Sequence, residues 1–270
     1  MTDRYEPLDG ADLWFFDIMK VAEPPGFFLI EEVDMRATRE IMVRMRQLGI
    51  KGTYTHVITR AVALAFARHP ELNRLVMGKR LVYPDSVDLG LSVSSDFALS
   101  GDPTMIVQNA EKKDLLQISA EIIQQAAEIR ENFKSDLEKT RRIVRVIPFS
   151  FLRRWLIRKM KTRMTMIRQK IGVFHITSVP QLRYAIPFIY PGIGSLVITR
   201  VENGVVVREG QPVVRPITRL GLVGDHRVWK GSAVSTLINE IKKILEEGEL
   251  MGELAADEMS MHNSITRPNC

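Results

Sequence analysis

The sequence predicts an α/β protein in which a mixed β-sheet is covered by helices. Short runs rich in β-branched residues alternate with longer amphipathic helical patterns, and no internal repeat or low-complexity segment interrupts them. A chain of 270 residues, 45% hydrophobic and 26% charged, is also long enough to bury one sizeable core. We therefore expect a single domain over residues 1–254 and a flexible tail over residues 255–270.

The first half of the chain predicts strands, helices and a hairpin. Its longest helix is indicated by Ile118, Ile122, Ile129 and Phe133, which recur at helical spacing. The predicted elements are strands over 27–33 and 87–94, helices over 34–47, 55–68 and 112–134, and a hairpin over 76–83 with Gly78 at its turn.

The second half predicts further strands and a closing helix. Asn203–Gly204 is typical of a two-residue hairpin turn, so we expect two strands to meet there. The predicted elements are strands over 173–177, 196–202, 204–208 and 216–224, and an amphipathic helix over 232–247.

The charge of the chain is unevenly distributed. Residues 139–170 contain twelve Lys or Arg and no acidic residue, although the whole chain has a net charge of only +6. The remainder carries 26 basic and 32 acidic residues, a net charge of −6. The sequence thus predicts an acidic body with one basic insert, and we expect no nucleic-acid partner because no reader motif accompanies the insert.

Several classes of site and location are disfavoured. The single cysteine, Cys270, allows no disulfide within the chain and no thiolate cluster, and no group of His, Asp and Glu has metal-ligand spacing, so we expect no metal. We find no secretion signal and no apolar run long enough to span a membrane, and we expect a cytoplasmic protein.

His226 is the first candidate for chemistry. It follows the predicted strand over 216–224 and precedes the closing helix, and functional side chains are often placed at such a strand end. On position alone, a hydrogen-bonded structural histidine is the commoner interpretation. We expect His56 and His69 to be structural, and His175 to face the side of the sheet opposite Thr177.

The segment around His226 resembles a family signature. Residues 224–231 are Gly-Asp-His-Arg-Val-Trp-Lys-Gly, similar to the Asp-His-Arg-x-x-Asp-Gly of the acyltransferase component of 2-oxoacid dehydrogenase complexes. Further similar segments keep the family's order over about 230 of the 270 residues. They are TYTH followed by RAVALAFARHPELN, the strand at 87–93, LLQISAEIIQQAAEIR, VFHITSV and FIYPGIGSLVITRV.

The resemblance implies a two-layer α/β sandwich of the chloramphenicol acetyltransferase type that forms a homotrimer or a larger assembly of trimers. It also implies a tunnel at each subunit interface, with coenzyme A as a substrate that enters from one side. His226 would act as general base on a thiol, and Thr177 would donate a hydrogen bond to the oxyanion. Without the resemblance, Thr177 is equally well explained as a β-branched residue in a strand.

Lys230 departs from the family, which has an aspartate at this position to help hold the histidine loop. Asp225 and Arg227 match the motif and are expected to anchor the loop. We hypothesise that Lys230 pairs with Asp12 or Asp17, as a charge-reversed version of the family's ion pair. The alternative is a catalytically decayed trimer that acts as a scaffold or assembly partner.

Two further departures concern partners. Only about ten residues precede the similar region, so we expect no lipoyl group on this chain. The protein would use a lipoyl or acyl carrier domain on another chain, or free coenzyme A thioesters. In the basic insert, residues 149–170 predict one amphipathic helix that covers the tunnel entrance, lies peripherally on an anionic membrane, or packs on a neighbouring subunit.

Overall fold

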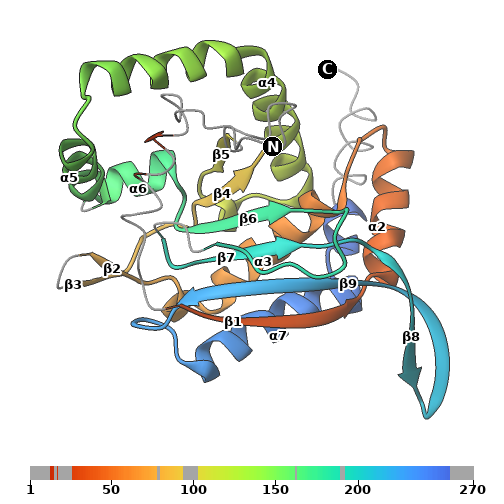
Figure 1. Ribbon diagram of the computed structural model, residues 1–270. Helices are drawn as coiled ribbons and strands as arrows, with labels where there is room; N and C mark the ends of the chain where they lie inside the picture. The colour runs from red at the N-terminus through yellow and green to blue at the C-terminus, as the bar shows by residue number, and fades with distance from the viewer. Residues whose placement is uncertain are drawn as a thin grey trace, which may run out of the picture.

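A seven-stranded mixed sheet forms the centre of the computed structural model, which describes residues 13–14, 17, 26–77, 80–93, 103–161, 163–188 and 192–255 (Figure 1). The strand order is β1-β9-β7-β6-β4-β5, and β8 pairs with β9 outside this path. The strands β4, β6 and β7 are parallel and the remaining pairings are antiparallel. The strands are β1 (Gly26–Asp34), β4 (Leu89–Ser92), β5 (Thr104–Val107), β6 (Phe174–Ser178), β7 (Gly194–Ile198), β8 (Glu202–Arg208) and β9 (Gln211–Asp225).

Helices cover one face of this sheet, which confirms the predicted two-layer α/β class. The central helix α3 packs on α7 and on the start of α4, and the core between helices and sheet includes Phe66, Phe174 and Trp229. The helices are α2 (Arg36–Gln47), α3 (Tyr54–Arg68), α4 (Leu115–Val146), α5 (Ser150–Lys161), α6 (Met164–Lys170) and α7 (Gly231–Glu247), with short 3-10 turns at η1 (Pro70–Leu72) and η3 (Ala110–Lys112).

The predicted hairpin over 76–83 is confirmed by the pairing of β2 (Leu75–Met77) with β3 (Arg80–Val82). Its expected turn residue, Gly78, lies outside the described residues. Residues 251–255 are helical, and the side chain of Glu253 binds Arg60 with Oε1–Nη2 at 2.7 Å. The expected flexible tail lies outside the described residues from 256 onward.

Helix α4 is longer than predicted. Its start is fixed by a capping box in which Asp114 Oδ1 accepts from the Gln117 backbone and Gln117 Oε1 accepts from the Asp114 backbone. The helix continues past residue 134 to Val146, because no residue breaks the pattern before Pro148 and ion pairs at i, i+3 support the added turns. The first part of the basic insert is therefore an extension of α4.

The second part of the insert is two helices instead of the one expected. Arg163 has an extended backbone, with φ −111° and ψ 112°, and separates α5 from α6. The break lets α6 place Ile167 in the core and Arg168 against Asp88, with Nε–Oδ2 at 2.6 Å. Amphipathic spacing alone does not reveal such a change of direction.

The predicted turn at Asn203–Gly204 is wrong. Both residues lie within β8, opposite Pro216 and Arg215 of β9. The chain turns at Glu209–Gly210, whose φ values of 52° and 76° are those of a tight hairpin turn. Gly204 has a packing role, because a Cβ atom there would lie 2.2 Å from Cδ1 of Ile217.

None of the helices in the described parts of the chain is long and apolar enough to cross a membrane.

Candidate active site

The loop that carries His226 begins directly after β9 and is held by Asp225. This carboxylate is buried, and Arg227 binds it through Nε–Oδ1 at 2.9 Å and Nη2–Oδ2 at 2.6 Å. The hydrogen bond to Asp225 raises the pKa of Arg227. The Asp225 carbonyl also accepts from the backbone N–H groups of Val228 and Trp229. These contacts support the anchoring roles predicted for Asp225 and Arg227.

Trp229 is the second anchor of the loop, and the sequence reasoning missed it. Its ring is fully buried beside Phe66 and Phe174, and its Nε1–H donates to the Leu72 carbonyl at 2.9 Å. Arg74 adds a hydrogen bond from Nη2 to the Val228 carbonyl, also at 2.9 Å. The sequence feature that could have indicated this anchor is a large aromatic residue at a variable position of the motif.

His226 is exposed at the tip of this loop. Its Nδ1 lies 3.0 Å from the carbonyl oxygen of Trp229, and its ring packs edge-to-face with that of Phe27, with the ring centres 5.2 Å apart. A carbonyl oxygen only accepts, so Nδ1 must carry the hydrogen. The neutral ring then has its lone pair on Nε2, which makes this atom a proton acceptor.

Lys230 is not part of this anchoring. It is exposed, and within the described parts of the chain its side chain forms no ion pair. Asp17 is buried between Arg153 and Arg154, with Oδ2–Nε at 2.5 Å and Oδ1–Nε at 3.0 Å, so the hypothesised pair with Lys230 is not formed. The other proposed partner, Asp12, lies outside the described residues.

Thr177 lies on the face of β6 that points away from α3. Phe174 points toward α3, because its ring packs on Phe66, and alternation along the strand puts residues 175 and 177 on the opposite face. The expectation that His175 and Thr177 face opposite sides is therefore wrong, since residues two apart share a face.

His175 is buried beside Ser92, whose Oγ lies 2.9 Å from its Nε2. Burial lowers the pKa of His175 to about 4, against a smaller opposing effect of its hydrogen bond with the Ile171 backbone. Burial also lowers the pKa of His56 to about 4, and its Nδ1 accepts from the Thr53 backbone at the start of α3. Both contacts fit structural histidines.

His226 and Thr177 lie at opposite ends of the sheet. Strand register puts Thr177 beside Val197 and Val197 beside Gly221, four residues before Asp225 on β9. With about 3.3 Å per residue and about 4.8 Å between strands, Thr177 and Asp225 are roughly 16 Å apart. The two predicted catalytic groups do not meet within one chain.

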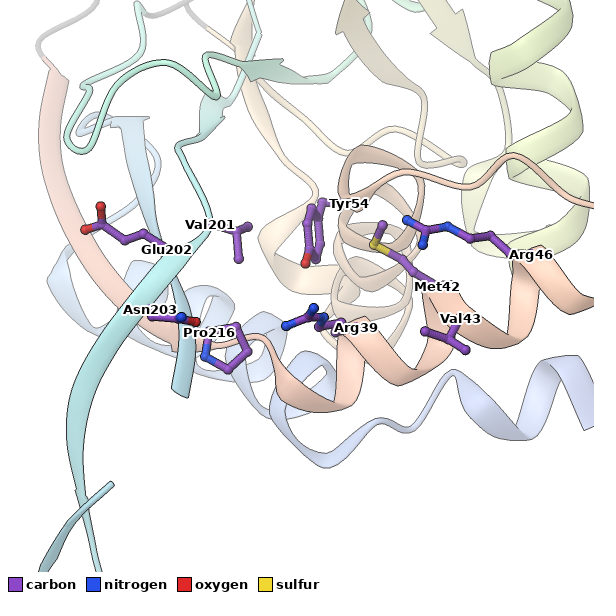
Figure 2. Close-up of a pocket in the computed structure, with 9 residues that line it drawn as sticks. All are labelled: Arg39, Met42, Val43, Arg46, Tyr54, Val201, Glu202, Asn203 and Pro216. Carbon is purple, nitrogen blue, oxygen red and sulfur yellow. The ribbon is translucent and has the colours of Figure 1, made fainter. Parts of the chain in front are cut away.

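A cleft of about 490 Å³ opens at the end of the sheet where Thr177 lies (Figure 2). It lies between α2, the start of α3 and the base of the β8–β9 hairpin, and Figure 2 shows Arg39, Arg46 and Tyr54 around it. Burial raises the pKa of Tyr54, and Arg39 and Arg46 partly oppose this effect. The other lining residues are Met42, Val43, Val201, Glu202, Asn203 and Pro216.

The sequence reasoning did not find this cleft, because its residues come from four separate elements. No group of three or more His, Cys, Asp and Glu side chains within the described ranges is arranged to hold a metal ion.

Comparison with known proteins places the fold and the loop in one family. The model of the 2-oxoacid dehydrogenases acyltransferase catalytic domain matches residues 14–140 and 154–253, which include Thr177 and the whole His226 loop. The chain belongs to this acyltransferase family. The match covers most of the chain and omits residues 141–153, at the corner between α4 and α5.

Individual members are distant in sequence. The chain is 24% identical over 233 residues to the dihydrolipoyllysine-residue acetyltransferase component of the Bacillus subtilis pyruvate dehydrogenase complex, and it spans about half the length of the curated relatives it matches. Its fold matches a probable dihydrolipoamide acetyltransferase from Listeria monocytogenes with a TM-score of 0.70 and 19% identity, covering 91% of this chain and 95% of that one.

The chloramphenicol acetyltransferase structure also matches, with a TM-score of 0.50 and 14% identity over 91% of this chain and all of that one. The predicted chloramphenicol acetyltransferase-like fold is thereby confirmed.

Proposed function

We propose that this acyltransferase domain moves an acyl group between coenzyme A and a second thiol, with His226 as general base and Thr177 of a neighbouring copy as oxyanion donor. The observation that carries the proposal is the hydrogen bond from His226 Nδ1–H to the Trp229 carbonyl. It fixes the tautomer whose Nε2 accepts a proton, on a loop held firmly by Asp225 and Trp229.

The chemistry follows from these two groups. Nε2 of His226 removes the proton from the attacking thiol, and the resulting thiolate adds to the carbonyl carbon of the acyl thioester. The hydroxyl of Thr177 donates a hydrogen bond to the tetrahedral oxyanion, which is worth about 3 kcal/mol of transition-state stabilisation. When the intermediate collapses, the departing sulfur takes the proton back from Nε2. No cofactor beyond coenzyme A as substrate is required.

A second copy of the chain is needed to complete this site. His226 and Thr177 lie at opposite ends of the strands in the sheet, so in this proposal a neighbouring subunit brings its Thr177 to this His226. The β8–β9 hairpin projects beyond the body of the protein and exposes Val205, Val207 and Val214, which supports a subunit contact (Figure 1). We infer a homotrimer or an assembly of trimers with the site at the subunit interface.

The cleft of Figure 2 is the proposed entrance for coenzyme A. Arg39 and Arg46 present two guanidinium groups, which suit phosphate, and Tyr54 offers an aromatic ring to the adenine. The cleft lies at the end of β6 and β7 where Thr177 is placed, but on the side of the helices, so the thiol arm would pass around this end of the sheet to reach the face that carries Thr177. The acceptor thiol would then belong to a lipoyl or acyl carrier domain on another chain.

The test is coenzyme A binding by calorimetry, followed by thiol exchange between acetyl-coenzyme A and dihydrolipoamide. We expect His226→Ala to lower turnover by about 10²–10⁴-fold without loss of coenzyme A binding. The double variant Arg39→Ala with Arg46→Ala should weaken coenzyme A binding. If the wild-type chain binds no coenzyme A and exchanges no thiol, the scaffold interpretation suggested by Lys230 replaces this proposal.

A further inference from the structure

Helix α5 buries one cation and exposes two aromatic side chains, which is unusual for a surface helix. In such a helix the apolar side chains face the protein and the charged ones face water. In α5, Arg153 is only 2% exposed, whereas Phe151 is 70% and Trp155 54% exposed. The outward-facing side of the helix is therefore apolar and aromatic.

The inward-facing cations of α5 explain how this orientation is held. Nε of Arg153 binds Oδ2 of the buried Asp17 at 2.5 Å, and Nη1 of Arg153 donates at 2.8 Å to the carbonyls of Ile147 and Pro148 just after α4. Arg154 binds the other oxygen of Asp17. These contacts close the end of α4 and dock α5 through Arg153 and Arg154, beside the buried Ile157, and they leave Phe151 and Trp155 exposed.

The exposed apolar residues lie in one stretch of the chain at the junction of the two helices, where the ring centres of Phe149 and Phe151 are 5.8 Å apart. We call it the apolar corner: Ile143, Val146, Phe149, Phe151, Leu152 and Trp155. Exposed cations lie on the same two helices, and Lys159 places its Nζ 5.8 Å from the centre of the Trp155 ring. These exposed cations are Arg142, Arg145, Arg158 and Lys159, and the sequence has no acidic residue between 139 and 170.

The apolar corner does not belong to the part of the fold that the family shares. The family model omits residues 141–153, which contain most of the corner. Figure 1 places α5 at the far end of α4, on the opposite side of the molecule from the β8–β9 hairpin that we assign to subunit contact. Neither the core nor the proposed active site requires these exposed side chains.

We propose that the apolar corner docks the protein on the surface of a lipid bilayer that contains anionic lipids. Aromatic and aliphatic side chains on a segment that carries cations and no acidic residue suit the boundary between lipid headgroups and acyl chains, where the cations meet lipid phosphates. A second copy is a poorer occupant, because two such corners carry the same charge and repel each other. Attachment is peripheral, since no helix in the described residues can cross the membrane.

Vesicle flotation tests the proposal with the full-length protein. The vesicles are phosphatidylcholine alone or phosphatidylcholine with about 30% phosphatidylglycerol. We expect the wild type to float with the anionic vesicles, and Phe151→Ser with Trp155→Ser to lower the partition coefficient at least about tenfold. The matched control is Leu81→Ser with Tyr83→Ser, which removes two apolar side chains of similar exposure, 46% and 58%, from β3 and its flank and should leave flotation unchanged.

The charge contribution is measured separately. Arg158→Gln with Lys159→Gln should weaken binding to the anionic vesicles by about fivefold per charge and leave the weak binding to neutral vesicles unchanged. Circular dichroism of each variant confirms folding. The proposal is overturned if the wild type floats with neither vesicle, or if the serine pair floats like the wild type. It is also overturned if the serine pair changes the size of the assembly by light scattering, which would assign the corner to a second copy.

Discussion

The Trp229 carbonyl oxygen accepts a hydrogen bond from Nδ1 of His226 at 3.0 Å, while the Trp229 side chain is fully buried in the core. Trp229 thus packs in the hydrophobic core through its side chain and fixes the tautomer of the proposed base through its carbonyl. In this chain, core packing by Trp229 anchors the His226 loop without a side-chain contact from Lys230.

This connection predicts different outcomes for two substitutions of Trp229. Trp229→Phe keeps an aromatic ring beside Phe66 and removes the indole donor to the Leu72 carbonyl, which still accepts from the Arg74 backbone, so it should lower the free energy of unfolding by only about 1 kcal/mol. Trp229→Ala should lower it by about 3–5 kcal/mol and release the loop. Urea unfolding measures stability, and thiol exchange measures turnover. Full turnover in a folded Trp229→Ala protein would show that the core does not hold the loop.

Lys230 is at the N-cap of α7, and this position predicts the effect of restoring the family residue. Its backbone is extended, with φ −94° and ψ 168°, and its side chain makes no cap hydrogen bond. In Lys230→Asp the new carboxylate would accept from the first free N–H groups of α7, which should raise the free energy of unfolding by about 1 kcal/mol. Thermal unfolding checks this, with Lys230→Ala as the control. Equal stability of the two variants would contradict the capping argument.

The buried His175 predicts a loss of stability at mildly acidic pH. Its pKa in the folded protein is about 4, below the value of 6.5 that it would have when unfolded. Between these values the unfolded chain binds more protons, so the contribution of neutral His175 is complete above pH 6.5 and is lost as the pH falls toward 4. The loss amounts to roughly 3 kcal/mol.

His175→Gln removes this titration. Denaturant unfolding at several pH values should show a flatter profile for His175→Gln than for the wild type between pH 6.5 and 4. His56 has a similarly lowered pKa and remains in both proteins, so a residual slope is expected. Parallel profiles of the two proteins would contradict the prediction.

The features that could be predicted from the sequence are those that depend on local hydrophobic pattern and on a short motif. Hydrophobic periodicity located most helices and strands but missed β5 and the break between α5 and α6, and the motif located His226 at the end of β9. The prediction of a turn at Asn203–Gly204 was wrong because a glycine can allow close packing, here against Ile217, as well as a turn. Local pattern does not distinguish these two uses.

Contacts between distant segments could not be predicted. The docking of α5 depends on Arg153 and Asp17, which are 136 positions apart, and the Trp229 anchor depends on a carbonyl 157 positions away. The hypothesis that Asp17 pairs with Lys230 failed for this reason, because charge alone does not select between Lys230 and Arg153. The cleft at Arg39 and Tyr54 likewise exists only when four elements meet.

The opposite placement of His226 and Thr177 predicts that two inactive variants restore each other. His226→Ala and Thr177→Ala should each lose most turnover, because each removes one half of every site. If the site is shared, a copy with intact Thr177 can pair with a neighbour that has intact His226. Random mixing of equal amounts would then regenerate roughly a quarter of the sites.

The experiment denatures the two variants together, refolds them and measures thiol exchange against each variant refolded alone. Thr177→Ser is the matched control, because it keeps the hydroxyl and should retain turnover without any partner. Recovery toward a quarter of wild-type activity places His226 and Thr177 on different copies. A mixture as inactive as its components, in assemblies of wild-type size, would put each site within one chain, against the register that holds the two residues at opposite ends of the sheet.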